Sequence, residues 1–272
     1  MKSYKKVMTI AGSDSGGGAG IQADLKTISS LGCYGTSVIT AITAQNTMGV
    51  TAIHPVPPEI VKKQMDAVLS DIGTDAIKIG MLHSADIIKT VAGVLQKFRM
   101  QKIVLDPVMV ATSGDKLIED NTVDALIEFL FPLAAIITPN IPEAEILTGI
   151  KISGRDEMIT SAMKLLNYGS QSILLKGGHL TGDVLCDVFI QKEKKDDIRI
   201  FENQKIHTNN VHGTGCTLSS AIASFMAHGE GTEMAVEKSI AYLQGAIMHG
   251  KDYKTGQGNG PVNHFFNPQK LT

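Results

Sequence analysis

Short apolar runs alternate with amphipathic stretches along nearly the whole chain. Runs of this length, with few polar residues inside them, are typical of strands that a sheet buries on both faces. We expect six such strands, at residues 7–11, 37–43, 76–79, 103–105, 134–137 and 172–175.

Between these runs, apolar residues recur at the three- and four-residue spacing of a helix. The clearest stripes contain Ile60, Val61, Met65, Val68 and Leu69, then Ile87, Ile88, Val91, Leu95 and Phe98, then Val123, Leu126, Ile127 and Leu130. Pro58 and Ser84 stand where the first two helices would begin, because proline suits the first turn and serine caps it. Strand–helix–strand units of this length require parallel pairing. The predicted fold class is therefore α/β, a three-layer α/β/α sandwich around a mostly parallel sheet.

Two regions break the alternation. Residues 184–191 and 198–201 flank the charged stretch KEKKDD and predict a β-hairpin at the edge of the sheet. The C-terminal part carries two consecutive helical patterns and then a glycine-rich tail, GQGNGPVNHF, which predicts a loop. Because there is neither an internal repeat nor a long linker, we expect residues 1–272 to form a single domain.

Composition excludes several classes of protein. The 25 Lys+Arg and 27 Asp+Glu among 272 residues give a formal net charge of −2, whereas nucleic-acid binding needs a basic excess or stripe. Residues 33–58 lack charge but contain Asn, Gln, Gly and Pro, so they predict no spanning helix. The three cysteines have no CxxC spacing, which argues against a disulfide framework or structural zinc. We expect a cytoplasmic protein without nucleic-acid or membrane partners.

A first glycine-rich loop, AGSDSGGGAGIQAD, follows the first predicted strand. Its glycines let another group approach the backbone closely. The loop is not a Walker A sequence, because no Gly-Lys-Ser/Thr is present, and Ile21 stands where GxGxxG needs a glycine. Two interpretations stay open: a flexible strand–helix turn, or a loop that binds a substrate against bare backbone.

A second loop, HGTGCTLSSA at 212–221, leads into a well-patterned helix. Free N–H groups at a helix N-terminus, with the helix dipole behind them, form an anion site suited to phosphate. Leu218 again breaks the GxGxxG pattern. Cys216 is either a buried free cysteine or a thiol whose pKa the helix terminus lowers.

Further polar residues follow other predicted strands. Asn140 and Glu143 suit a Mg²⁺ site, but with Pro142 they equally suit the start of a helix. Asp106 ends another strand and faces either a loop or a metal and phosphate. Lys176 precedes Gly177-Gly178 and either reaches a phosphate or is solvated. The histidines show no HExxH or paired-ligand spacing, so a catalytic transition metal lacks support.

Taken in order, seven segments resemble the hydroxymethylpyrimidine/phosphomethylpyrimidine kinases of thiamine biosynthesis, in the ribokinase-like superfamily. They are AGSDSGGGAGIQADLKT at 11–27, ITAQNT at 42–47, KIGML at 78–82, DPVM at 106–109, TPNIPEA at 138–144, LLKGGH at 174–179 and HGTGC at 212–216. The resemblance implies a ribokinase-like fold, a homodimer, and ATP and Mg²⁺ as cofactors. The implied reactions are phosphorylation of 4-amino-5-hydroxymethyl-2-methylpyrimidine and then of its monophosphate.

The resemblance also assigns roles to residues. The pyrimidine pocket would use Gly12, Asp24, Gln45, Met81 and Val108. Asp24 would meet the hydroxymethyl group, and the Gln45 amide, which both donates and accepts, would bind the aminopyrimidine edge.

At the phosphate end, the resemblance implies an anion hole formed by Gly213, Thr214, Gly215 and Cys216. Asn140 and Glu143 would support Mg²⁺, with Asp106 nearby and Lys176 on the nucleotide phosphates. Most sugar kinases of the superfamily carry Asp at position 216, as the base that takes the hydroxyl proton. Our hypothesis is that Cys216, biased toward thiolate by the helix terminus, takes this proton here, because phosphoryl transfer depends mostly on positioning and charge stabilisation.

Three alternatives remain. Pyridoxal kinases share these loops, and a thiol at Cys216 would add reversibly to the aldehyde of pyridoxal, whereas TAQNTMGV at 43–50 favours the aminopyrimidine. A regulator that binds a vitamin or nucleotide without turnover would share only the fold. A dinucleotide-dependent oxidoreductase is disfavoured because both loops fail the GxGxxG pattern. His179, His212 and His264 lie near glycine-rich loops and receive no catalytic role.

Overall fold

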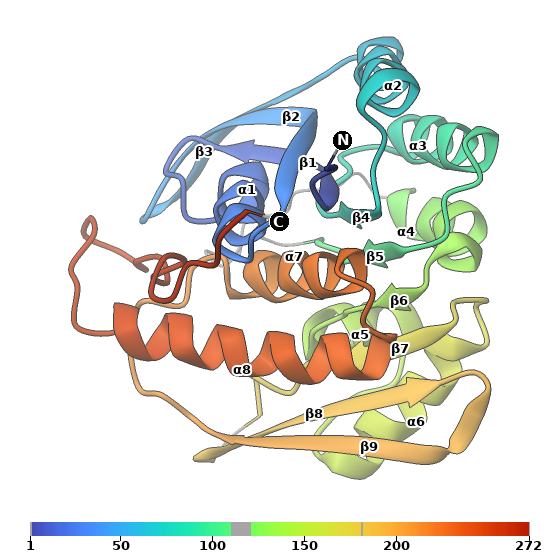
Figure 1. Ribbon diagram of the computed structural model, residues 1–272. Helices are drawn as coiled ribbons and strands as arrows, with labels where there is room; N and C mark the ends of the chain where they lie inside the picture. The colour runs from blue at the N-terminus through green and yellow to red at the C-terminus, as the bar shows by residue number, and fades with distance from the viewer. Residues whose placement is uncertain (1, 110–120, 181, 272) are drawn as a thin grey trace.

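The computed structural model describes residues 2–109, 121–180 and 182–271 (Figure 1). Within these ranges, nine strands form one sheet in the order β3-β2-β1-β4-β5-β6-β7-β8-β9. Their bounds are β1 Lys6–Asp14, β2 Tyr34–Asn46, β3 Gly49–Pro55, β4 Ala76–Ile79, β5 Ile103–Leu105, β6 Ile136–Ile137, β7 Ser172–Leu175, β8 Val184–Gln191 and β9 Lys194–Gln204.

The centre of the sheet is parallel and its two edges are antiparallel. Strands β2, β1, β4, β5, β6 and β7 pair in parallel, while β3 joins β2 and β8 joins β7 in the antiparallel sense. Strand β9 completes the hairpin predicted at 184–201. The carboxyl ends of the parallel strands therefore meet at one edge, where open α/β sheets bind their ligands.

Helices cover both faces, as predicted. The core on one face is formed with α2 Pro58–Ala67, α3 Ala85–Lys97, α4 Thr122–Ala125, α5 Ile141–Thr148 and α6 Arg155–Leu166. The other face packs against α1 Gly20–Ser30, α7 Thr214–Ala227 and α8 Thr232–Gly250. Figure 1 shows α7 and α8 side by side in front of the sheet. None of the helices in the described ranges has both the length and the apolar run needed to cross a membrane.

Local signals placed the helix starts correctly. Pro58 begins α2, and the Ser84 hydroxyl caps α3 by accepting the Ile87 N–H. The third predicted helical stripe is α4 followed by a π-helical turn, Leu126–Leu130. Strand β3 was not predicted, because its residues are half-buried or exposed at the sheet edge and so form no apolar run.

Lys78 places an ammonium group inside the core. It lies in the middle of β4, and its Nζ is 2.8 Å from Asp24 Oδ2 on α1, with both side chains at 0% exposure. Asp24 also accepts the hydroxyls of Thr9, at 2.6 Å, and Ser220, at 2.8 Å. Burial alone would favour neutral lysine, but the neighbouring Asp24 carboxylate holds the pKa of Lys78 above its ordinary value.

Replacing Lys78 by Met leaves the Asp24 carboxylate buried without its counter-charge. We expect Lys78→Met to lower the free energy of unfolding by about 3–5 kcal/mol, the usual cost of breaking a buried ion pair from one side. Adding Asp24→Asn removes the second charge and should recover most of this loss. Urea unfolding followed by circular dichroism measures both variants. Equal losses in the single and double variants would contradict this account of the pair.

Candidate active site

A cavity of about 1010 Å³ opens at the carboxyl edge of the sheet. Its walls come from the end of β2, from the loops after β1, β4, β5, β6, β7 and β9, and from α7 and α8. Twelve of the thirteen predicted site residues line it: Gly12, Gln45, Met81, Asp106, Val108, Asn140, Glu143, Lys176, Gly213, Thr214, Gly215 and Cys216. The two glycine-rich loops therefore share one chamber.

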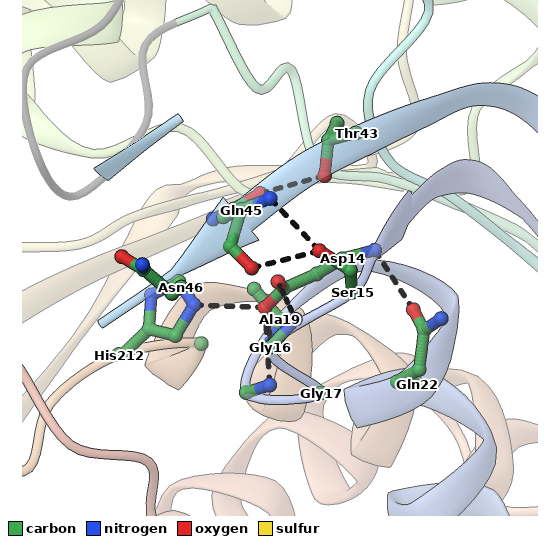
Figure 2. A network of polar contacts seen from close by, with 12 residues as sticks. Asp14, Ser15, Gly16, Gly17, Ala19, Gln22, Thr43, Gln45, Asn46 and His212 are labelled. Atoms are coloured by element: carbon green, nitrogen blue, oxygen red, sulfur yellow. Dashed lines mark hydrogen bonds and ion pairs between the residues drawn. The ribbon is translucent and has the colours of Figure 1, made fainter. Parts of the chain in front are cut away.

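The first glycine-rich loop is shaped by the carboxylate of Asp14 (Figure 2). Asp14 Oδ1 accepts the Gly16 N–H at 2.8 Å, and Oδ2 accepts those of Gly18, at 3.0 Å, and Ala19, at 2.8 Å. These bonds turn the chain from β1 into α1. Because the Asp14 side chain accepts hydrogen bonds from three backbone N–H groups, the loop has a defined conformation. It is not the flexible turn that was one of the two interpretations of this sequence.

The second loop ends in a left-handed turn at Gly213, with φ +79°. A Cβ at this position would overlap the carbonyl oxygen of Gly18, so the two loops touch through their backbones. Helix α7 begins at Thr214, and the first amides of a helix have no acceptor within it. Together with the dipole of α7, the amides of Gly215 and Cys216 on the cavity wall are suited to binding an anion, and we call this position the anion site.

Elsewhere on the cavity wall, apolar side chains line the cavity together with one amide. Met81 and Val108 belong to a small apolar cluster with Ala41. The Gln45 side chain extends from the end of β2, and its Oε1 accepts the Thr43 hydroxyl at 3.1 Å (Figure 2). An apolar wall with an amide at its margin suits a flat heteroaromatic ring that has one polar edge.

Asp24 does not stand where we predicted. We expected its carboxylate to meet a substrate hydroxyl, but Asp24 is fully buried and does not line the cavity. Its two oxygens are taken by Lys78, Thr9 and Ser220. Lys78 does line the cavity, so Asp24 acts on the site through the Lys78 ammonium.

The prediction of a lowered pKa at Cys216 is wrong. Burial raises the pKa of this thiol to about 11, and the nearby carboxylates Asp24 and Asp106 add to the effect. The Lys78 ammonium and a hydrogen bond from the Gly20 N–H act in the opposite direction but are weaker. The start of a helix lowers a thiol pKa only where desolvation is small.

A second charged group gathers around Lys176. Its Nζ donates to Asp106 Oδ1 at 2.8 Å, and a Cβ on Gly215 would lie 3.3 Å from it, so this cation stands beside the anion site. Burial, with a smaller contribution from the Asp106 carboxylate, raises the pKa of Glu143 to about 7, against the opposing effect of Lys176. Both carboxylates of this group line the cavity close to Lys176.

The helix-start interpretation of residues 140–143 is confirmed. Asn140 Oδ1 accepts the Glu143 N–H at 2.9 Å, and Glu143 Oε2 accepts the Asn140 N–H at 2.8 Å, a reciprocal cap of α5. Among the residues that the structure describes, no group of three His, Cys, Asp or Glu side chains is arranged to hold a metal ion. The magnesium role of Asn140, Glu143 and Asp106 stays a prediction.

The cavity also contains residues that were not selected from the sequence. Lys78, Asp14 and His212 all line the cavity, yet none was given a role. A signal existed for Lys78, since a lysine within the apolar run AIKI is rarely buried without a partner. For Asp14 and His212 no local signal was available, because their contact joins residues 198 positions apart.

Comparison with known proteins shows which family this chain resembles. A family model for phosphomethylpyrimidine kinase matches residues 14–263. The hydroxymethylpyrimidine/phosphomethylpyrimidine kinase of Rhizobium meliloti is 51% identical over 259 residues, which are 95% of this chain and 96% of that protein. The chain is also 49% identical to the bifunctional thiamine biosynthesis protein ThiED of Geobacter sulfurreducens, of which it spans 52%.

Solved structures agree with the fold. A crystal structure of phosphomethylpyrimidine kinase from Clostridium difficile has a TM-score of 0.79 and 46% identity, covering 89% of this chain and 99% of that one. The pyridoxal kinase of Staphylococcus aureus in complex with pyridoxal has a TM-score of 0.88 and 35% identity, covering 97% and 94%. The fold is therefore that of these kinases, and the chain belongs to the phosphomethylpyrimidine kinase family.

Proposed function

We propose that this chain transfers the γ-phosphoryl group of ATP to 4-amino-5-hydroxymethyl-2-methylpyrimidine, and then to the monophosphate that results, in thiamine biosynthesis. The observation that carries the proposal is the single cavity in which the Gln45 amide and the Gly213–Cys216 turn both stand. It is supported by the 51% identity to a kinase named for these two substrates. The same resemblance supports a cytoplasmic homodimer of a single domain.

The acceptor end of the cavity fits an aminopyrimidine. Gln45 Oε1 already accepts one hydroxyl, so its NH₂ group is left to donate to a ring nitrogen while Oε1 accepts from the ring amine. Met81 and Val108 provide apolar contact for the ring and its methyl group. Held in this way, the hydroxymethyl group would point toward the turn at Gly213–Cys216.

The donor end of the cavity has the features that ATP requires. Its far wall is made by Ile240, Leu243 and Ile247 of α8, an apolar surface for the adenine. Lys176 lines the same cavity beside Gly215 of the Gly213–Cys216 turn (the anion turn), where it would meet the phosphates. Amides of the turn would then stabilise the charge on the transferred group, the main requirement of phosphoryl transfer.

Mg²⁺ completes the proposal for the donor end. Mg²⁺ is usually held by one or two carboxylates while keeping most of its waters and contacting the nucleotide phosphates. Asp106 and Glu143 fit this requirement, because both are carboxylates that line the cavity close to Lys176, the cation expected to meet the phosphates. When bound, the ion would neutralise charge on the nucleotide phosphates. Asn140 would contribute less, since its Oδ1 caps α5.

We keep Cys216 as the proposed proton acceptor, although its thiol pKa is raised and not lowered as the sequence suggested. With a pKa of about 11, roughly one thiol in 10⁴ is ionised at pH 7. Only this ionised fraction accepts the hydroxyl proton, because a protonated thiol cannot take a second one, and a loose transition state lets the transfer follow the first bonding of the acceptor oxygen to phosphorus. Lys78 is the cation that stabilises the thiolate before it takes the proton.

Pyridoxal kinase is the second candidate function. It is favoured by the likeness to the Staphylococcus aureus enzyme, which extends over 97% of this chain. A pyridine ring with a hydroxymethyl group would fit the same apolar wall. The Gln45 amide favours the aminopyrimidine, since that edge offers both a donor and an acceptor.

Steady-state assays of ADP release decide between the two substrates. We expect kcat/KM for hydroxymethylpyrimidine to exceed that for pyridoxal by on the order of 10-fold or more, because pyridoxal lacks the ring amine and so loses a hydrogen bond of about 1 kcal/mol to the half-buried Gln45 amide. The monophosphate of the pyrimidine should also be a substrate. Preference for pyridoxal would replace the proposed function by its alternative, and no acceptor-dependent ADP would refute both.

The role of Cys216 predicts a particular pH dependence. Since the thiol titrates well above neutrality, kcat/KM of the wild type should rise roughly tenfold per pH unit from pH 6 toward pH 9. Cys216→Ala should lower kcat on the order of 10²–10⁴-fold and flatten the profile.

Cys33 supplies the matched control for this measurement. It is a buried free cysteine outside the cavity, packed against the core of α7 and α8, and burial raises its pKa to about 12. Cys33→Ala should leave the pH profile unchanged. A flat wild-type profile, or a Cys216→Ala variant that keeps most of its kcat, would show that Cys216 is not the base.

A further inference from the structure

The side chain of His212, directly before the Gly213–Cys216 turn, contacts the Asp14 carboxylate that shapes the first glycine-rich loop. His212 Nε2 lies 2.9 Å from Asp14 Oδ2, with the two side chains 10% and 3% exposed (Figure 2). Burial opposes ionisation of Asp14, but hydrogen bonds from His212, Ala19 and Gly16 outweigh it and hold the pKa of Asp14 below its ordinary value. An ionised carboxylate only accepts hydrogen bonds, so His212 carries a proton on Nε2 and donates it.

On the acceptor side, Asp14 is tied to the residues that hold Gln45. Asp14 ends β1 and lies opposite Thr43 of β2 in the parallel register. The Thr43 hydroxyl contacts both the Ser13 carbonyl, at 2.8 Å, and Gln45 Oε1, at 3.1 Å. The Ser15 hydroxyl bonds to the backbone of Gln45, at 2.7 and 2.8 Å. A shift of Asp14 therefore shifts the end of the cavity where Gln45 stands.

On the anion side, His212 immediately precedes Gly213 and is itself confined. A Cβ on Gly18 would overlap the imidazole ring and would lie 3.3 Å from Pro261, so the ring is held between the first loop and the C-terminal segment. The His212 N–H donates to the Gly260 carbonyl at 3.0 Å. With its ring and backbone both fixed, His212 transmits the position of Asp14 to the turn that follows it.

We propose that Asp14 and His212 are a positioning pair, which sets the anion turn at the correct distance from the acceptor and so directs the phosphoryl group to the acceptor hydroxyl instead of to water. The proposal rests on the proposed function. If the pair is broken, the acceptor oxygen is displaced and water attacks more often. In that side reaction a water oxygen bonds to the γ-phosphorus as the bond to ADP breaks, giving ADP, phosphate and a proton.

Two substitutions at His212 separate positioning from folding. His212→Leu keeps bulk but removes the donor, and Asp14 still holds the first loop through Gly16, Gly18 and Ala19. His212→Gln keeps an N–H donor within reach of Asp14. His264→Gln is the matched control, because His264 is a buried histidine that contacts Thr217 of α7 and does not line the cavity.

The measurement is the amount of ADP formed per phosphorylated pyrimidine, with kcat and both KM values. The wild type, His212→Gln and His264→Gln should give a ratio near one. His212→Leu should raise the ratio above one and lower kcat on the order of 10–100-fold, the usual effect of a small misplacement, with the KM for ATP little changed. A ratio of one with unchanged kcat in His212→Leu would overturn the proposal.

Hydrogen exchange tests the coupling without any substrate. His212→Leu should raise amide exchange in residues 14–20, where the wild type and His264→Gln stay protected. Unchanged exchange in His212→Leu would overturn the proposal on structural grounds. A wild type that phosphorylates no acceptor would refute the proposed function, and the exchange result would still decide whether the pair couples the loops.

Discussion

The site depends on a direct backbone contact between two glycines, Gly18 of the first glycine-rich loop and Gly213 before α7. The Gly18 carbonyl lies where a Cβ on Gly213 would be, and the ring of His212 lies where a Cβ on Gly18 would be. Any larger residue at these two positions would push the loops apart. This steric constraint explains why glycines are concentrated after β1 and before α7, and it brings the anion turn into the same chamber as the acceptor pocket.

Buried charge gives that chamber its chemistry. The ammonium groups of Lys78 and Lys176 are each paired with an aspartate at 2.8 Å, and both line the cavity near Cys216 and Gly215. Such pairs contribute little net stability, because desolvation offsets most of the attraction. Their value lies in fixed cations that need no reorganisation when negative charge develops during phosphoryl transfer.

Much of the fold was predictable, because its signals are local. Apolar runs marked the parallel strands, and Ser84 and Pro58 marked helix starts. Strand β3 was not predicted, because this edge strand is half-buried or exposed and has no apolar run. The candidate site was largely located from motifs, since the carboxyl ends of parallel strands converge.

The energetics of the site were not predictable in the same way. The helix terminus at Cys216 suggested a lowered pKa, but burial and two carboxylates brought by tertiary packing reversed it. Asp24 lay in the right motif, yet its carboxylate points to Lys78 rather than into the cavity, which depends on how α1 packs on β4 and α7. Desolvation and contacts between residues far apart in the chain cannot be inferred from a local sequence pattern.

The central claim is that one chamber holds the acceptor ring at Gln45 and the migrating phosphoryl group at Gly213–Cys216. A crystal structure with a non-hydrolysable ATP analogue and hydroxymethylpyrimidine tests it most directly. The account predicts γ-phosphate oxygens within hydrogen-bond distance of the amides of Gly215 and Cys216, and the acceptor oxygen about 3–3.5 Å from the γ-phosphorus. A γ-phosphate bound away from this turn, or a ring bound away from Gln45, would contradict it.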